Sequence, residues 1–187
     1  MTQRKYAPNI LTPQKLKSLS LRYLGRYASS TENLRRILMR VVNKSVQAHG
    51  TNREEACASV EDIIRRFLDL GYLNDRVYAE TRAESLIQLG RSIPAVRQNL
   101  QAKGVPDVVI ARVIEDLTGR MGNLNRCAAV AFAKRRHIGP WRLEGRSKNR
   151  KRDLAALGRQ GFSYQIACRI VDASSIEECE LILASEE

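Results

Sequence analysis

Apolar residues of this chain recur at intervals of three and four over most of its length, in segments that stop at glycine. The segment that follows Asn74 and Asp75 stops at Gly90, for example, and the next one stops at Gly104. Such spacing places the apolar side chains on one face of a helix. Period-two alternation of β-branched residues, which is typical of strands, is absent over any useful length. The sequence therefore predicts an all-α fold.

Capping residues predict where several helices begin. The run Ser29 to Glu32 is expected to cap one helix, and Thr51 to Glu54 reads as a capping box, in which a hydroxyl and a carboxylate satisfy the first free amides. Asn74 with Asp75 should cap the next helix. In the last third, helices are expected from about 123 to 136, 148 to 160 and 163 to 171. On the first helix, the spacing predicts one apolar face made of Leu16, Leu19, Tyr23 and Tyr27.

Two parts of the chain repeat one pattern at an offset of 57 residues. The segment LQAKGV (100–105) matches LGRQGF (157–162), and at the same offset IARVIE meets ACRIVD. Each copy reads as a helix, a glycine stop, and a helix with an arginine among apolar residues. The segment LRRIL (34–38) echoes VRQNL (96–100), which gives a third, more diverged copy near the N-terminus. We therefore expect three tandem three-helix units, a repeat architecture in which neighbours stabilise each other.

The repeat and the composition predict five parts. Residues 1–13 contain two prolines and lack apolar periodicity, which favours a flexible N-terminal arm. The repeat units are expected over residues 14–73, 74–118 and 119–173, and an acidic C-terminal tail over residues 174–187. An array with its own core can be stable as a monomer, so we expect a monomer.

Positive charge is concentrated in two blocks. The formal net charge is +12, from 32 basic and 20 acidic residues. Residues 1–45 hold ten basic residues and one acidic residue, and residues 119–161 hold twelve and two, whereas residues 46–118 are nearly balanced. Such a distribution indicates a polyanion or an acidic protein surface as the partner, touched at two separated places.

The sequence argues against catalysis and against a membrane span. It contains no G-x-x-x-x-G-K-[ST] phosphate loop, no H-E-x-x-H and no G-x-S-x-G motif, so we expect a protein that is not an enzyme and uses no cofactor. The four cysteines form no C-x-x-C pair, which favours reduced core thiols over a metal site. No stretch approaches the roughly 20 apolar residues of a membrane span, and no secretory signal opens the chain, so a cytoplasmic location is expected.

A series of motifs resembles the RecX family of recombination regulators, over about residues 17 to 172. The motifs are SxxxLRRxL from Ser30, LGYLNDxxYA from Leu70, GRS from Gly90, KGV from Lys103 and QGFSY from Gln160. The chain departs from the family pattern at residues 42–50, which replace a short glycine turn, and in the loop around Trp141.

The resemblance implies an elongated, curved array of three-helix repeats that lies in the groove of the RecA filament on single-stranded DNA. It implies inhibition of ATP hydrolysis, of strand exchange and of the stimulated self-cleavage of the damage-response repressor. Such a protein regulates recombination, DNA repair and the SOS response. The expected partner is the RecA nucleoprotein filament, and direct contact with single- or double-stranded DNA stays open.

The first group of candidate contact residues follows residue 14. Arginine can bind carboxylate or phosphate through two parallel hydrogen bonds. Because one acidic residue accompanies ten basic residues here, pairing at i,i+4 is not expected to account for the cluster, and the alternative is a solvated helical face. The candidates are Arg22, Arg26, Arg35, Arg36 and Arg40.

The second group lies in the last third of the chain. A surface that is merely solubilising would usually mix both signs, which favours a contact with phosphate or with acidic side chains. Trp141 is expected either to contact the partner or to pack on the core of the third unit. The basic candidates are Lys134, Arg135, Arg136, Arg150, Lys151 and Arg152.

The middle of the chain offers Arg82, Arg91 and Arg97 to a groove along the array. Pairing with Glu80, Glu84 or Asp75 is the favoured alternative for these three arginines. The rival function is a helix-turn-helix DNA-binding protein or transcription regulator built from two helices of one unit.

Overall fold

The computed structural model describes residues 11–184, and within this range its regular secondary structure is entirely helical, with no strand. The all-α prediction is confirmed. The predicted arm over residues 1–13 lies mostly outside the described residues. None of the helices described is long and apolar enough to span a membrane. The helices are α1 (Pro13–Leu24), α2 (Thr31–His49), α3 (Arg53–Asp69), α4 (Asp75–Gln88), α5 (Ile93–Ala102), α6 (Asp107–Met121), α7 (Leu124–Arg136), α8 (Arg146–Arg159), α9 (Tyr164–Asp172) and α10 (Ile176–Ala184), with a short 3₁₀ helix η1 (Gly139–Trp141).

The chain divides into two compact units, with a boundary inside α4. The first unit runs to Tyr78 and includes Lys103–Val105, and the second comprises Ala79–Ala102 and the chain from Pro106 onward. The predicted division into three repeats stays a prediction. Helix α6 extends to Met121, three residues past the expected end of the second repeat.

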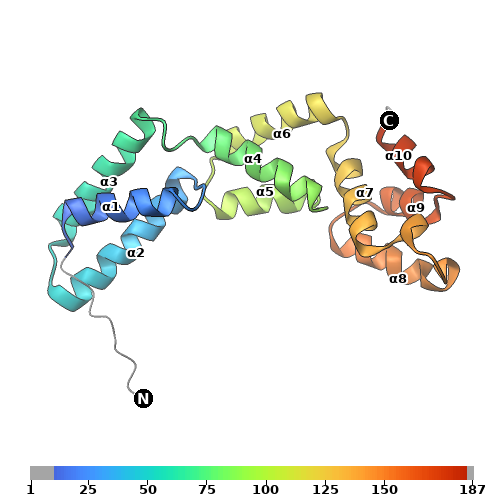
Figure 1. Ribbon diagram of the computed structural model, residues 1–187, viewed down its shortest axis with the longest axis horizontal. Coiled ribbons are helices and arrows are strands. Elements are labelled where there is room, and N and C mark those ends of the chain that lie inside the picture. Colours follow the sequence, from blue (N-terminus) through green and yellow to red (C-terminus); the bar gives the residue numbers. More distant parts are fainter. Residues whose placement is uncertain (1–10, 185–187) are drawn as a thin grey trace, which may run out of the picture. The chain divides into compact units, whose positions relative to one another are not determined.

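The first unit packs α1, α2 and α3 around one apolar core (Figure 1). Leu16 of α1, Leu34 and Leu38 of α2, and Val60 and Phe67 of α3 are all at most 2% exposed. Burying a side chain of this kind contributes roughly 1.5–3 kcal/mol. The spacing of these residues is helical, but the buried faces differ in part from those expected from the sequence. Val42 rather than the expected Val41 is buried on α2, and Leu68, expected on the apolar face of α3, is 45% exposed.

The buried face of α1 differs from the prediction. Leu19 is 37% exposed, and Tyr27 is exposed and lies beyond the end of the helix. Ser20 is buried instead and satisfies its hydroxyl by donating to the carbonyl of Leu16 at 2.8 Å. A buried serine is tolerated here because this local bond gives its hydroxyl a partner.

Capping follows the prediction at one helix and departs from it at another. Ser30 is the N-cap of α2, as expected, and its hydroxyl accepts from the Asn33 amide. The cap of α3 is Asn52 rather than Thr51, because the Asn52 carboxamide oxygen accepts from the amides of Glu54 and Glu55. The Thr51 hydroxyl contacts the Ser45 hydroxyl at 2.7 Å. The unusual residues 42–50 extend α2 to His49, with a left-handed Gly50 after it.

The second unit ends in a group of helices around α9, which contacts α7, α8, η1 and α10 (Figure 1). Phe132, Leu157 and Ile170 are buried there. Helix α10 occupies the segment expected only as an acidic tail. It packs on α7 and α9 through Cys179, which is fully buried, while Glu177 and Glu178 stay exposed. The acidic composition of this segment concealed a short amphipathic helix.

Gly90 lies where only glycine fits. Its φ is +76°, and a Cβ added there would lie 2.6 Å from the backbone N and Cα of Phe132. A backbone neighbour cannot rotate away as a side chain can. Gly71 has a similar φ of +72°, but a Cβ there would meet nothing within 4 Å. An alanine at Gly71 therefore tests the effect of backbone conformation alone, whereas an alanine at Gly90 tests backbone conformation and close packing together.

We expect Gly90→Ala to destabilise the protein by about 3 kcal/mol or more, whereas Gly71→Ala should cost about 1–2 kcal/mol. Both variants carry the strain of a left-handed alanine, and only Gly90→Ala also forces the turn away from α7. Urea unfolding followed by circular dichroism measures both changes. Equal losses of unfolding free energy would contradict the close approach of Gly90 to Phe132.

Candidate partner-binding surface

Three arginines of the first predicted group lie on the surface of the first unit. Arg22 is in the last turn of α1, Arg26 follows the helix, and Arg40 is on the outer face of α2. The Arg40 Nε donates to the Arg36 carbonyl at 3.3 Å. Among residues 11–184, no carboxylate lies within ion-pair distance of these three side chains. Their guanidinium groups are therefore available to an anionic partner.

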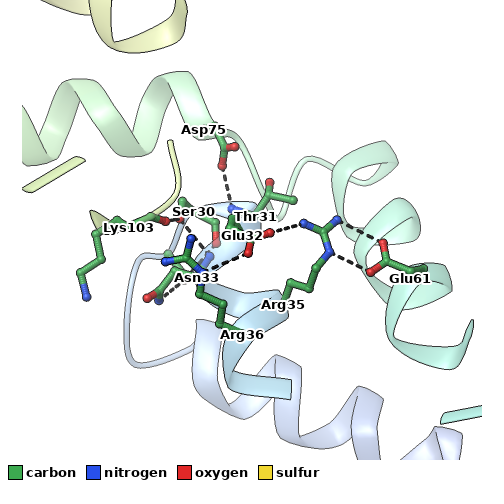
Figure 2. Close-up of polar contacts among 10 residues, drawn as sticks. Ser30, Thr31, Glu32, Asn33, Arg35, Arg36, Glu61, Asp75 and Lys103 are labelled. Atoms are coloured by element: carbon green, nitrogen blue, oxygen red, sulfur yellow. Dashed lines mark hydrogen bonds and ion pairs between the residues drawn. The ribbon is translucent and has the colours of Figure 1, made fainter. Parts of the chain in front are cut away.

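Arg35 and Arg36 are engaged within the chain instead (Figure 2). Arg35 binds both carboxylate oxygens of Glu61, at 2.8 and 3.1 Å, and donates to Glu32 at 2.6 Å. Arg36 donates to the other Glu32 oxygen at 3.0 Å. The expectation that pairing at i,i+4 does not account for this cluster is wrong for Arg36, whereas Arg35 pairs at i,i+3 and with α3. The fold brings Glu61 from α3 to Arg35, a contact that the sequence does not show.

This ion-pair network shifts the protonation of its members. The Arg35 guanidinium, followed by that of Arg36, holds the pKa of Glu32 below its ordinary value of 4.5, although partial burial opposes the shift. Hydrogen bonds to Glu61 and then to Glu32 raise the pKa of Arg35. Glu32 and Arg35 are each about one-third exposed, so solvent weakens the interaction. The network is a partly buried electrostatic contact between α2 and α3.

The start of α2 is also tied to two segments of the first unit that are distant in sequence (Figure 2). The Ser30 hydroxyl donates to the Lys103 carbonyl, and the Thr31 amide donates to the Asp75 carboxylate at 2.7 Å. Gly104 lies so close that a Cβ there would be 2.5 Å or less from side-chain carbons of Glu32. The first amide of α2 is thus satisfied by the first residue of α4.

The second unit contains a parallel arrangement at the start of α5. The Ile93 amide donates to the Asn125 carboxamide oxygen at 3.0 Å, as the Thr31 amide does to Asp75. Gly161 lies against Ser92, whose hydroxyl would be 2.9 Å from a Cβ at that glycine. A serine, the amide of the next residue, a side-chain oxygen from the start of a later helix and a turn glycine therefore occur together twice. The two sites differ in one respect, because the Ser30 hydroxyl donates to the Lys103 carbonyl whereas the buried Ser92 hydroxyl has no hydrogen-bond partner among the described residues. The tandem-repeat interpretation stays a prediction.

The middle arginines do not use the acidic partners that the sequence favoured. Glu80 and Glu84 both pair with Arg120, at 2.5 and 3.2 Å. Arg82 donates to Asn99 at 3.1 Å and Arg91 donates to Gln160 at 3.2 Å. Arg97 is exposed and makes no ion pair with any described residue. No signal in the sequence points to Arg120, since its acidic partners are 36 and 40 residues away.

The second predicted group provides exposed cations at two helices of the second unit. Lys134, Arg135 and Arg136 form the last turn of α7, where positive charge also interacts favourably with the helix dipole. Lys151 and Arg152 are exposed on α8. In the part of the chain that the structure covers, none of these five side chains forms an ion pair.

Arg150 differs from the other members of the second group. Its Nε and Nη2 bind the two carboxylate oxygens of Asp172 at 2.7 and 2.6 Å. The Arg150 guanidinium lowers the pKa of Asp172, and Asp172 raises the pKa of Arg150. This arginine connects α8 to the end of α9, so its charge is largely balanced within the chain.

The loop around Trp141 is held by two arginines that were not among the candidates. Trp141 is half-buried in η1, and the next residue, Arg142, binds both oxygens of the buried Asp153 at 2.6 and 3.1 Å. Arg146 donates to the carbonyls of Val171, Ala173 and Ser174 at the end of α9 and just after it. These bonds fix both ends of the segment from Arg142 to Arg146.

The described residues contain no group of three or more His, Cys, Asp or Glu side chains that could hold a metal ion. A hollow of about 280 Å³ lies between α8 and the end of α9, lined by Arg146, Ser147, Arg150, Val171 and Asp172. Its lining is mostly charged. The described surface instead presents exposed guanidinium and ammonium groups, the side-chain types that pair with carboxylate and phosphate.

No protein-family model matches the chain. The sequence is 40% identical over 169 residues to the regulatory protein RecX of Myxococcus xanthus, which covers 89% of each chain. It is 33% identical over 113 residues to the regulatory protein RecX of Agrobacterium fabrum, covering 60% of this chain and 58% of that relative. A crystal structure of a regulatory protein RecX superposes with a TM-score of 0.58 at 21% identity, over 86% of this chain and 72% of that one.

We expect Glu32→Gln to lower the free energy of unfolding at pH 7 by at most about 1 kcal/mol, because the carboxylate is partly exposed. The depressed pKa of Glu32 means that its contribution is present above pH 4.5 and is lost as the pH falls through the lower folded-state pKa. The variant should therefore lose less stability than the wild type between about pH 5 and about pH 3. Urea midpoints over this pH range measure the difference.

The matched control is Glu54→Gln, which removes an exposed carboxylate that makes no ion pair with the described residues. The stability that this variant loses between about pH 5 and about pH 3 should be nearly the same as the loss measured for the wild type. Parallel pH profiles of the wild type and Glu32→Gln would exclude the network as a source of acid sensitivity.

Proposed function

Because this chain belongs to the RecX family of regulatory proteins, we propose that it regulates the RecA recombinase by binding the filament that RecA forms on single-stranded DNA, and that this binding inhibits RecA. Family membership carries the proposal. The exposed cations of both units support it, since the filament combines a protein surface with a polyanion. Inhibition of this kind would restrain recombination, DNA repair and the SOS response. A protein with this role would act in the cytoplasm, where the filament forms.

The mechanism is binding rather than catalysis. The first unit offers Arg22, Arg26 and Arg40, and the second offers the last turn of α7 together with Lys151 and Arg152. Two sets of contacts on one chain add avidity when both engage the same partner. A monomer that contacts neighbouring RecA protomers in this way would obstruct the movement between them that each ATP cycle requires. Direct contact with single- or double-stranded DNA is compatible with the same cations.

The decisive experiment is a titration of the single-strand-dependent ATPase activity of the cognate RecA with this protein. We expect strong inhibition at well below one molecule per RecA monomer, and inhibition should persist when single-stranded DNA is saturating. An unchanged ATPase rate and unchanged strand exchange, together with sequence-specific binding to a palindromic duplex, would reject the proposal in favour of the helix-turn-helix alternative.

The exposed cations should matter more than the paired ones. We expect Lys151→Ala with Arg152→Ala to weaken filament binding about tenfold, and the dependence of affinity on salt should become shallower by roughly 0.7 for each phosphate group that the variant no longer binds. The charge-matched control is Arg65→Ala with Arg120→Ala, which removes two cations that pair with Asp62 and with Glu80 and Glu84. Fluorescence anisotropy at several salt concentrations compares the two double variants, and an equal weakening of binding would show that only net charge matters.

A further inference from the structure

Leu143 is the most exposed large apolar residue described, with 98% of its surface accessible. Other exposed apolar side chains, such as Leu181 and Val108, are each 68% exposed and lie on helices. A single exposed leucine is common on protein surfaces and by itself carries no meaning. Leu143 differs from the other exposed apolar residues because it lies on a loop that hydrogen bonds hold at both ends.

The loop holds Leu143 away from the core by named interactions. On one side, Arg142 binds the buried Asp153 through two hydrogen bonds, and its amide donates to the Gly139 carbonyl at 3.1 Å. On the other side, the Asn149 carboxamide donates to the Gly145 carbonyl at 2.9 Å, and Gly145 adopts a φ of +68°. Arg146 is anchored to the carbonyls at the end of α9. A partner can therefore bury the Leu143 side chain without removing it from the core of this protein. Because these bonds already hold the loop, binding costs little backbone conformational entropy.

The surroundings of the loop are cationic. The first turn of α8 continues with the exposed Lys148, and Lys151 and Arg152 follow on the same helix. The hollow lined by Arg146, Ser147 and Arg150 begins at the same end of α8. Glu144 is the one acidic neighbour in sequence between Trp141 and Arg152. A partner that receives Leu143 should therefore present carboxylates around an apolar depression.

We propose that Leu143 is an anchor that inserts into an apolar, acid-rimmed pocket on the protein component of the filament, rather than between DNA bases. This inference deepens the proposed function and rests on it. A leucine has no π-face for stacking on single-stranded bases. Leucine wedges are inserted at base steps of duplex DNA, whereas the proposed filament forms on single-stranded DNA. The buried core of a protein interface is more apolar than its polar rim, which suits a leucine surrounded by cations. The nearby aromatic side chain, Trp141, is half-buried and belongs to the adjoining η1.

The test compares Leu143→Ala with the control Leu181→Ala, which shortens an exposed leucine on α10. Both variants should keep the circular dichroism spectrum and unfolding midpoint of the wild type, because neither side chain belongs to the core. Leu143→Ala should bind RecA filaments about tenfold more weakly or worse, as expected for an anchor that loses its three terminal side-chain carbons, and inhibition of ATPase activity should fall in parallel. Leu143→Met should retain most of the affinity.

Three results separate the possibilities. If the wild type inhibits RecA and Leu143→Ala is as potent as the control, the anchor is rejected while the proposed function stands. If Leu143→Ala loses equal affinity for single-stranded DNA without RecA, insertion between bases replaces the protein pocket and the proposal is overturned. If the wild type itself fails to inhibit RecA, the proposed function fails and the anchor, which rests on it, fails with it.

Discussion

The structure depends on how the first amides of its helices are satisfied. A helix leaves its first backbone N–H groups without partners in the same helix, and burying such a group unpaired costs about 1–3 kcal/mol. At α2 and α5 the first of these amides is satisfied by a side-chain oxygen from the start of another helix, Asp75 or Asn125. A turn glycine lies against each of these helix starts, Gly104 at α2 and Gly161 at α5. A requirement of local backbone chemistry thus becomes a contact between segments that are distant in sequence.

Ion pairs that form only in the folded chain also determine which positive charges remain exposed. Several arginines that look alike in sequence divide into two classes once the chain is folded. Arg35, Arg120, Arg142 and Arg150 each bind carboxylates and connect one segment to another. The exposed cations at the end of α7 and on α8 are left to face solvent. The formal net charge therefore describes the composition of the chain better than it describes the surface available to a partner.

The sequence predicted most of the fold and only part of the candidate surface. Nine of the ten α-helices in the described range are expected from apolar spacing and glycine stops, because these signals are local. Helix α10 was missed because the C-terminal segment was interpreted from its acidic charge, although six of the nine residues of the helix are apolar, and the cap of α3 was assigned to Thr51 because a hydroxyl and an amide oxygen serve equally well in a motif. The pairing of Arg35 with Glu61 spans 26 residues, and the exposure of Leu143 depends on where Asp153 lies. Both depend on tertiary structure, which a pattern of residue types does not contain.

The repeated helix-start contact also has an evolutionary consequence. One half of the contact is a serine with the amide that follows it, and the other half is an acidic or amide side chain with a turn glycine from later in the chain. A gene segment that encodes one of each could be duplicated in tandem, and the new copy would find a fitting neighbour on both sides without any new interface. The result would be a chain lengthened by whole helical units, with the same kind of helix-start contact at each new joint.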